Sequence, residues 1–261
     1  MKILLLGLGS IGSRHATNLR ALRPDAQLVT VDPDPAKGAD YRDWLQAIME
    51  NADADGAVVA TPGRLHMAHM NVMAEKRIPF LVEKPPCVPE QTAKYSNLAG
   101  RIYMVLQVLP CAVGFQYRFH PALQGLAVDA NIAFHAQEDL LARYGPDVLG
   151  VTGCHVVDLA LYLLGPVREV ELVQDGHQML GRIMHESGLT SSYDIRIDRG
   201  PRQSWLTVGE KVIELDAAPE MYAAEMESWL AWLEGGARDT RLATLRDGLA
   251  VMEVLERVEK L

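Results

Sequence analysis

The sequence lacks the cysteine patterns that mark several classes of protein. Its 261 residues include three cysteines, Cys87, Cys111 and Cys154, which are far apart and form no C-x-x-C pair. The number and spacing of the cysteines predict a protein that resides in a reducing compartment. They predict neither a disulfide framework nor a structural zinc site. Cys154 precedes His155, a pair that can indicate a nucleophile, but a small buried thiol is the more ordinary role of such a cysteine.

The chain also lacks an excess of positive charge and long apolar runs. Its net charge of −9 argues against a nucleic-acid or anionic membrane partner, since both require a basic face. No apolar stretch approaches the length of a membrane span. The apolar start resembles a signal peptide, but glycines interrupt it and Arg14 and His15 occupy the place of a cleavage site. We therefore expect a cytoplasmic protein of one large domain or two modest ones.

A glycine motif follows the first apolar run. Gly7-x-Gly9-x-x-Gly12 lies between a strand pattern and a helix pattern, and Asp32 follows at the end of a second apolar run. Gly7 permits a tight turn, Gly9 lets a pyrophosphate approach the backbone, and Gly12 lets the helix pack closely. This context favours a dinucleotide site over a glycine turn without ligand or a methyltransferase loop. The expected cofactor contacts here are Gly7, Gly9, Ser10, Ile11, Gly12 and Asp32.

The first half of the chain alternates strand-like and helix-like segments. Such alternation predicts a parallel, doubly wound sheet of the Rossmann type, whose ligands bind at the carboxyl ends of the strands. Breaks after the second and third strands place turns at that edge. The expected strands are 3–6, 28–31, 56–60 and 79–82, and the expected helices are 11–22, 41–50, 64–75 and 89–99.

The second half predicts an α+β domain built on a mainly antiparallel sheet. A strand is expected at 112–119 and a helix at 155–164, and 101–109 fit either type. Short runs rich in β-branched residues then predict a meander. The meander runs are 167–173, 179–185, 190–197, 203–208 and 211–215, and further helices are expected at 220–233 and 240–261. The resulting division is a cofactor domain, 1–118, and a substrate and oligomerisation domain, 119–261.

Six motifs follow one another along the chain: GLGSIGSRH, TP(x)3H, LVEKP, GFQYRFHP, GCHVVDL and TLRDGLAVME. Taken in this order, they resemble the glucose–fructose oxidoreductase and inositol dehydrogenase family (Gfo/Idh/MocA), especially members acting in polysaccharide biosynthesis. The resemblance implies an NAD(P)-dependent dehydrogenase. It would transfer a hydride between nicotinamide and a secondary alcohol or ketone of a sugar, sugar nucleotide or cyclitol. It also implies a homodimer or homotetramer.

Lys84 is the strongest candidate for chemistry in the first half. An E-K-P at the end of a strand puts an ammonium at the nicotinamide end of the site, where it can bind the reacting oxygen and move a proton. The resemblance assigns this position a catalytic role, while a solvated lysine is the plain alternative. Glu83 is expected to orient Lys84 beside the cofactor. Thr61, Pro62 and His66 are expected to approach the cofactor, although a surface histidine fits His66 equally well.

His155 is the corresponding candidate in the second half. It would act as general acid or base on the substrate, with Asp158, one turn later, fixing its tautomer. A structural histidine at the start of a buried helix is the alternative. Arg118 and His120 are expected to bind substrate, or else to bond to strand ends. Many family members carry an aspartate where this chain has Val151, and Asp147 or Asp158 would have to replace it.

The cofactor is expected to be NAD, because Asp32 is followed by Pro33 and a carboxylate repels a 2′-phosphate. Lys37 or Arg42 can compensate, which leaves NADP open. No metal is expected, since the remaining histidines lack ligand spacing. Two other functions stay open. One is a weakly catalytic or non-catalytic nucleotide-binding sensor or assembly protein. The other is a reductase of imines or double bonds.

Overall fold

The computed structural model describes the chain except for residues 106–108, 127, 129, 140–151 and 261. Val151 and Asp147 therefore lie outside the described residues. The chain divides into two compact units, and each is considered by itself. The first comprises Met1–Gly114 and Tyr222–Leu249, and the second comprises Phe115–Met221 and Ala250–Leu261. The division expected from the sequence, 1–118 and 119–261, did not include the return of Tyr222–Leu249 to the first unit.

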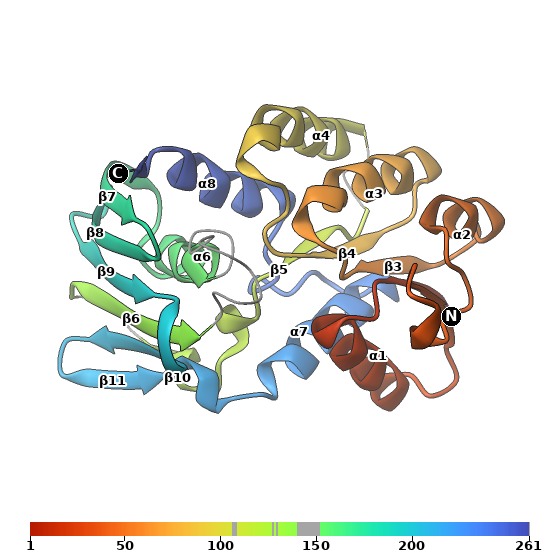
Figure 1. Ribbon diagram of the computed structural model, residues 1–261, viewed down its shortest axis with the longest axis horizontal. Helices are drawn as coiled ribbons and strands as arrows, with labels where there is room; N and C mark the ends of the chain where they lie inside the picture. Colours follow the sequence, from red (N-terminus) through yellow and green to blue (C-terminus); the bar gives the residue numbers. More distant parts are fainter. Residues whose placement is uncertain (106–108, 127, 129, 140–151, 261) are drawn as a thin grey trace. The chain divides into compact units, whose positions relative to one another are not determined.

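The first unit contains the expected parallel sheet, with strand order β2-β1-β3-β4-β5 (Figure 1). Nearly all of its central strand residues are buried, as in sheets covered by helices on both faces. The strands are β1 (Lys2–Leu6), β2 (Gln27–Val31), β3 (Gly56–Val59), β4 (Phe80–Glu83) and β5 (Ala112–Gly114). The strand expected at 112–119 is wrong beyond Gly114. A 3-10 turn, Gln116–Phe119, follows instead, and all four of its residues are buried.

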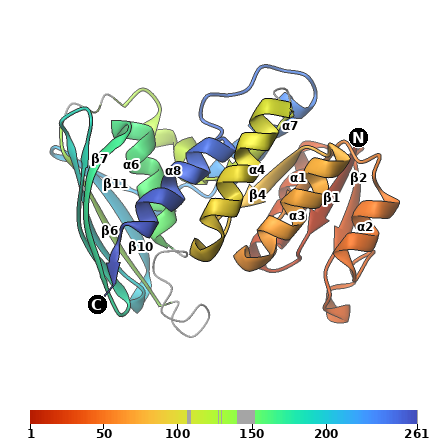
Figure 2. The same cartoon turned by 90° about the horizontal axis from the view of Figure 1, so that it is seen from above.

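Helices cover both faces of this sheet. α3 and α4 lie on one face, with α2 beside α3, and α1 and α7 lie on the other (Figures 1 and 2). All of these helices were expected, with ends shifted by a few residues. They are α1 (Ser10–Leu22), α2 (Trp44–Glu50), α3 (Gly63–Lys76), α4 (Thr92–Val105) and α7 (Met221–Leu233).

The side chains of α7 explain why this helix joins the first unit. Trp229 is fully buried, and its ring lies so close to Gly56 that a β-carbon there would be 3.0 Å away. The Trp229 indole N–H also donates to the Pro110 carbonyl at 3.0 Å. Arg23, at the end of α1, forms ion pairs with Glu227 and Glu234. The apolar contacts dominate, because partly exposed ion pairs contribute little.

The second unit is built on a larger, mainly antiparallel sheet with strand order β11-β10-β6-β9-β8-β7-β12. The expected meander holds for β7, β8 and β9. β6, which the sequence did not predict, lies between β9 and β10 and runs parallel to β9. The strands are β6 (Ile132–Asp139), β7 (Val167–Asp175), β8 (Gln178–His185), β9 (Thr190–Arg196), β10 (Asp198–Val208), β11 (Lys211–Glu214) and β12 (Glu259–Lys260).

Two helices complete the described structure. α6 (Cys154–Leu164) lies against one face of the larger sheet (Figure 2) and is buried along most of its length. α8 (Leu245–Glu256) ends before the short strand β12, so the helix expected to continue to 261 is shorter. Of the described helices, none is both long enough and apolar enough to cross a membrane.

Candidate cofactor and active site

The glycine loop after β1 has the shape of a phosphate cradle. Gly7 has a φ of +93°, and a β-carbon there would lie 2.6 Å from the Ala60 carbonyl oxygen. A β-carbon on Gly12 would overlap the backbone of Gly7. Gly9, by contrast, faces open space and caps α1 without a side-chain hydrogen bond. The first N–H groups of α1 and the bare face of Gly9 therefore fit a diphosphate.

Asp32 is anchored beside this loop. Its Oδ2 accepts a hydrogen bond from the Leu8 N–H at 2.7 Å, and its Oδ1 accepts one from the Asp34 N–H at 2.9 Å. A carboxylate offers about four acceptor positions, so each oxygen retains capacity for a hydroxyl. The contacts of Asp32 with the glycine loop fit the predicted role at the ribose.

The sheet order brings the predicted residues of the first unit to one edge. Gly7, Asp32, Thr61 and Lys84 follow β1, β2, β3 and β4, whose parallel strands all end on the same side. The direction of the strand order reverses beside β1, and ligands of open α/β sheets bind at such a reversal. Lys84 is half-buried at this edge. We call Glu83, Lys84 and Pro85 the Lys84 turn.

His66 is buried between two backbone carbonyls. Its ring is 1% exposed, with Nδ1 at 2.8 Å from the Pro85 carbonyl oxygen and Nε2 at 2.7 Å from the Thr61 carbonyl oxygen. A neutral ring has one N–H and donates to one of these carbonyls. The cofactor role expected for His66 stays a prediction. Burial lowers the pKa of His66, against the opposite effect of the two carbonyls. The Thr61 hydroxyl is likewise taken, by His69 Nδ1 at 3.1 Å.

Glu83 is a buried partner of a histidine. Its Oε1 lies 2.7 Å from His15 Nε2, and both side chains are nearly inaccessible. Burial raises the pKa of Glu83, but the hydrogen bond with His15 and the nearby charge of Lys84 outweigh it, so the pKa is below its ordinary value. The carboxylate therefore contacts His15, and the expected cofactor contact of Glu83 stays a prediction. Sequence reasoning missed His15, although its place three residues after Gly12, on the helix that packs under the strand ends, was the available signal.

In the second unit, Arg118 and Asp158 bind each other. Arg118 Nε and Nη2 donate to the two oxygens of Asp158 at 2.9 and 2.6 Å. The two side chains are 4% and 0% exposed, and the Arg118 guanidinium also lies over the Tyr162 ring. Arg118, predicted to bind substrate, and Asp158, predicted to orient His155, thus form a buried ion pair with two hydrogen bonds, and both roles stay predictions.

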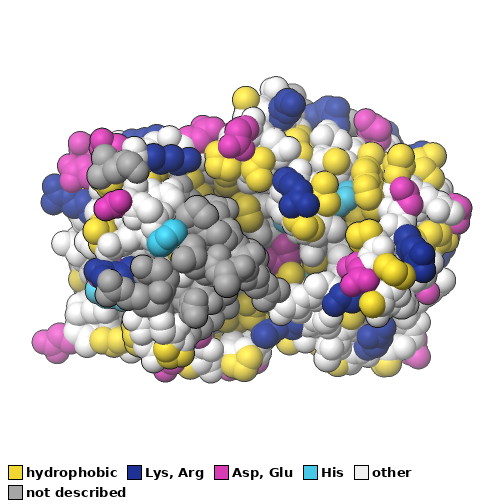
Figure 3. Space-filling model, in the orientation of Figure 1, with side chains coloured by type: hydrophobic (Ala, Val, Ile, Leu, Met, Phe, Trp, Pro, Cys, Tyr) yellow, Lys and Arg dark blue, Asp and Glu magenta, His cyan; other side chains and the backbone are white. Residues whose placement is uncertain are grey.

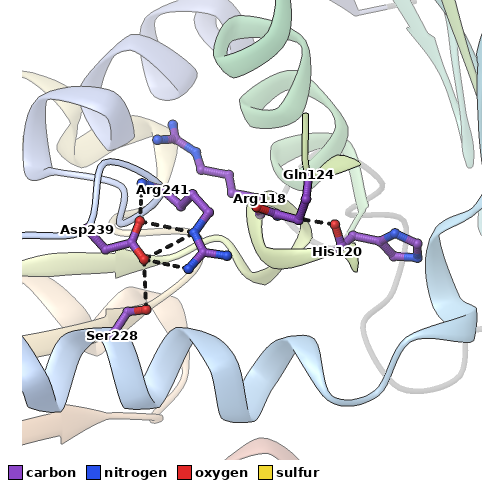
Figure 4. Close-up of polar contacts among 6 residues, drawn as sticks. All are labelled: Arg118, His120, Gln124, Ser228, Asp239 and Arg241. Atoms are coloured by element: carbon purple, nitrogen blue, oxygen red, sulfur yellow. Dashed lines mark hydrogen bonds and ion pairs between the residues drawn. The ribbon is translucent and has the colours of Figure 1, made fainter. Parts of the chain in front are cut away.

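His120 is also held by its own unit. Its Nε2 donates to the Glu214 carbonyl at 3.1 Å, and its Nδ1 accepts from the Ala122 N–H at 3.2 Å. The Gln124 amide donates to the His120 carbonyl (Figure 4). His120 is 5% exposed and both of its ring nitrogens are bonded, and the expected substrate contact of this residue stays a prediction.

His155 lies in the first turn of α6 and is 4% exposed. Its ring is 5.0 Å from the Tyr117 ring and 6.3 Å from the Phe115 ring, and its Nε2 is 3.4 Å from Gln116 Nε2. The preceding Cys154 is fully buried, as expected of a packing thiol. Within the described part of the chain, no three His, Cys, Asp or Glu side chains are grouped to hold a metal.

Residues 1–106 match the model of the oxidoreductase family GFO_IDH_MocA, which is described as an NAD-binding Rossmann fold. The amino-terminal domain belongs to the Gfo/Idh/MocA oxidoreductase family. This match confirms the resemblance stated from the sequence motifs and bears out NAD as the expected cofactor of that domain.

Curated relatives match part of the chain. Inositol 2-dehydrogenase 4 of Saccharopolyspora erythraea is 30% identical over 131 residues, which are 46% of this chain and 38% of that protein. The scyllo-inositol 2-dehydrogenase (NAD(+)) of Bacillus subtilis is 31% identical over 129 residues, 45% of this chain and 36% of that protein. The matches thus span less than two fifths of these relatives.

Solved structures match nearly the whole fold. A myo-inositol dehydrogenase from Corynebacterium glutamicum has a TM-score of 0.79 and 19% identity, covering 99% of this chain and 96% of that chain. The UDP-N-acetylglucosamine 3-dehydrogenase GnnA of Acidithiobacillus ferrooxidans gives the same four values. At this identity the likeness shows the fold, including the mainly antiparallel second sheet.

Proposed function

We propose that the chain is an NAD-dependent dehydrogenase that oxidises a secondary alcohol of a sugar, sugar nucleotide or cyclitol, or reduces the matching ketone. The observation that carries this proposal is the common edge of the first sheet, where the glycine loop, Asp32 and Lys84 follow β1, β2 and β4. The names of the curated relatives and structural neighbours supply the substrate class.

In this proposal the bound nicotinamide accepts or supplies the hydride. The backbone of Gly9 and the first turn of α1 hold the diphosphate, and Asp32 accepts hydrogen bonds from the ribose. Lys84 binds the reacting oxygen and takes or returns its proton. His155 remains a candidate second acid or base. On the face of the first unit that Figure 3 shows, acidic and basic side chains are interspersed.

The test is turnover by the purified chain. Wild-type protein is incubated with NAD and a panel of cyclitols, sugars and sugar nucleotides, and the formation of reduced nicotinamide is followed by absorbance. We expect turnover of at least one panel member and its loss in Lys84→Ala. Turnover that is unchanged in Lys84→Ala would instead favour a reductase of imines or double bonds.

A second candidate is a nucleotide-binding protein with little or no catalysis. The observation in its favour is that Arg118, His120 and Asp158, all expected at the substrate, are bonded within their own unit. Binding of NAD without turnover of any panel member would support this candidate. The expected homodimer or homotetramer remains a prediction, which sedimentation of the purified chain can check.

A further inference from the structure

The two neighbours of Lys84 in sequence are each held by a buried histidine from a different helix. On one side, the Glu83 carboxylate contacts His15 of α1 at 2.7 Å. On the other side, the Pro85 carbonyl contacts His66 of α3 at 2.8 Å. The two histidines are each 1% exposed. A lysine between two such anchored neighbours has a fixed backbone on both sides.

The His66 contacts also tie the Lys84 turn to the preceding loop. The same imidazole contacts the Thr61 carbonyl, so one ring spans the ends of β3 and β4. The loops touch a second time, because a β-carbon on Gly63 would lie 3.3 Å from the Pro85 ring. Glu83 is fixed laterally as well, since a β-carbon on Gly114 would lie 3.5 Å from its carboxylate.

From this arrangement we propose that His15 and His66 are positioning residues for Lys84. They fix the backbone and the local charge around its ammonium without touching the substrate. The inference rests on the role proposed for Lys84. It concerns two histidines for which the sequence suggested either no role or a cofactor contact.

The groups around the Lys84 turn determine which measurement will detect the loss of a histidine contact. Glu83 is an ionised carboxylate next to Lys84, and its ionisation depends on His15. Loss of the His15 contact allows the carboxylate to move or take up a proton, which changes the field at the ammonium. Loss of the His66 contact allows Pro85, and with it the lysine backbone, to move. Either change alters the position and the accessibility of the Lys84 amine, and therefore the rate at which it reacts with an electrophile.

The experiment measures amine reactivity and requires no substrate. Wild type, His15→Gln and His66→Gln are trace-labelled with an acetylating reagent, and the modification of each lysine is read by peptide mass spectrometry. Lys76 and Lys94, both exposed in the same unit, are internal standards. His69→Gln is the matched control, because it removes another buried histidine of α3 that contacts the Thr61 side chain instead of the Lys84 turn.

We expect the Lys84 rate, relative to the two standards, to change by about threefold or more in the His15 and His66 variants, about 0.65 kcal/mol in activation free energy, and to stay near wild type in His69→Gln. An unchanged relative rate in a variant that keeps its cooperative thermal transition would overturn the proposal. The two histidines lie on different helices, so each substitution tests the proposal independently. One variant that folds is therefore sufficient to decide it. Where wild type turns over a substrate, kcat should fall in the same variants while NAD affinity is kept. A wild type without turnover would refute the proposed function and leave the labelling result standing.

Discussion

The two units differ in how they treat the residues that the sequence marked for chemistry. In the first unit, Gly9, Asp32 and Lys84 follow strand ends, and the backbone itself places them at one edge. In the second unit, Arg118 and Asp158 are polar side chains that pair with each other in the interior. A motif defined by backbone geometry therefore predicts well where its residues lie in the fold. A motif of polar side chains does not predict which groups those side chains will bind.

The largest expected effect tests the first unit. Lys84→Ala should lower kcat by about 10²- to 10⁴-fold, which is the usual contribution of a positioned acid or base. NAD affinity should stay within about threefold of wild type, because the lysine acts on the substrate oxygen. Steady-state kinetics and calorimetric titration measure the two quantities. Lys94→Ala removes an exposed lysine of the same unit and serves as control.

The next effect tests the second unit. Arg118→Ala removes two hydrogen-bond donors from the buried Asp158 carboxylate, and breaking such a pair costs about 3–5 kcal/mol of unfolding free energy. Denaturant unfolding measures the loss. Arg118→Met combined with Asp158→Leu should recover much of it, because both charges are then removed. If Arg118→Ala were as stable as wild type, the Arg118–Asp158 ion pair would not contribute to the stability of the fold.

A smaller effect is pH-dependent and lies in the first unit. Burial lowers the pKa of His69 to about 4, from an ordinary value of 6.5. The unfolded chain therefore takes up this proton at a higher pH than the folded chain. The free energy of unfolding should fall as pH decreases from 6.5 to 4, with His69 contributing at most about 3 kcal/mol. Urea unfolding over this range should show a shallower decrease in His69→Gln than in wild type, and an equal decrease in both proteins would contradict this prediction.

The smallest effect separates two glycines of one loop. Gly9→Ala should leave stability near wild type, since a β-carbon there meets open space, and should weaken NAD binding about tenfold, or about 1.4 kcal/mol. Gly12→Ala should destabilise the fold, because its β-carbon would overlap the Gly7 backbone. Thermal unfolding and NAD titration of both variants measure the contrast. Equal NAD affinity of Gly9→Ala and wild type would place the diphosphate elsewhere.

The parts of the structure that could be predicted are those fixed by interactions between residues close together in the sequence. Gly7, Gly12 and the strands of the first sheet could be predicted because steric limits and hydrophobic periodicity act over a few residues. The return of α7 could not, since Trp229 packs against Gly56, which is distant in sequence. The contacts of His66 and of the Arg118–Asp158 pair were missed for the same reason. A polar side chain bonds to the group that folding brings close to it, and the local sequence pattern does not identify that group.

The most direct test of the account is a calorimetric titration of NAD into the wild-type chain and Gly9→Ala. We expect one saturable site per chain, which binds NAD more weakly in Gly9→Ala and is retained in Lys84→Ala. No heat of binding with oxidised or reduced nucleotide at millimolar concentration, from a wild-type chain that unfolds cooperatively, would contradict it.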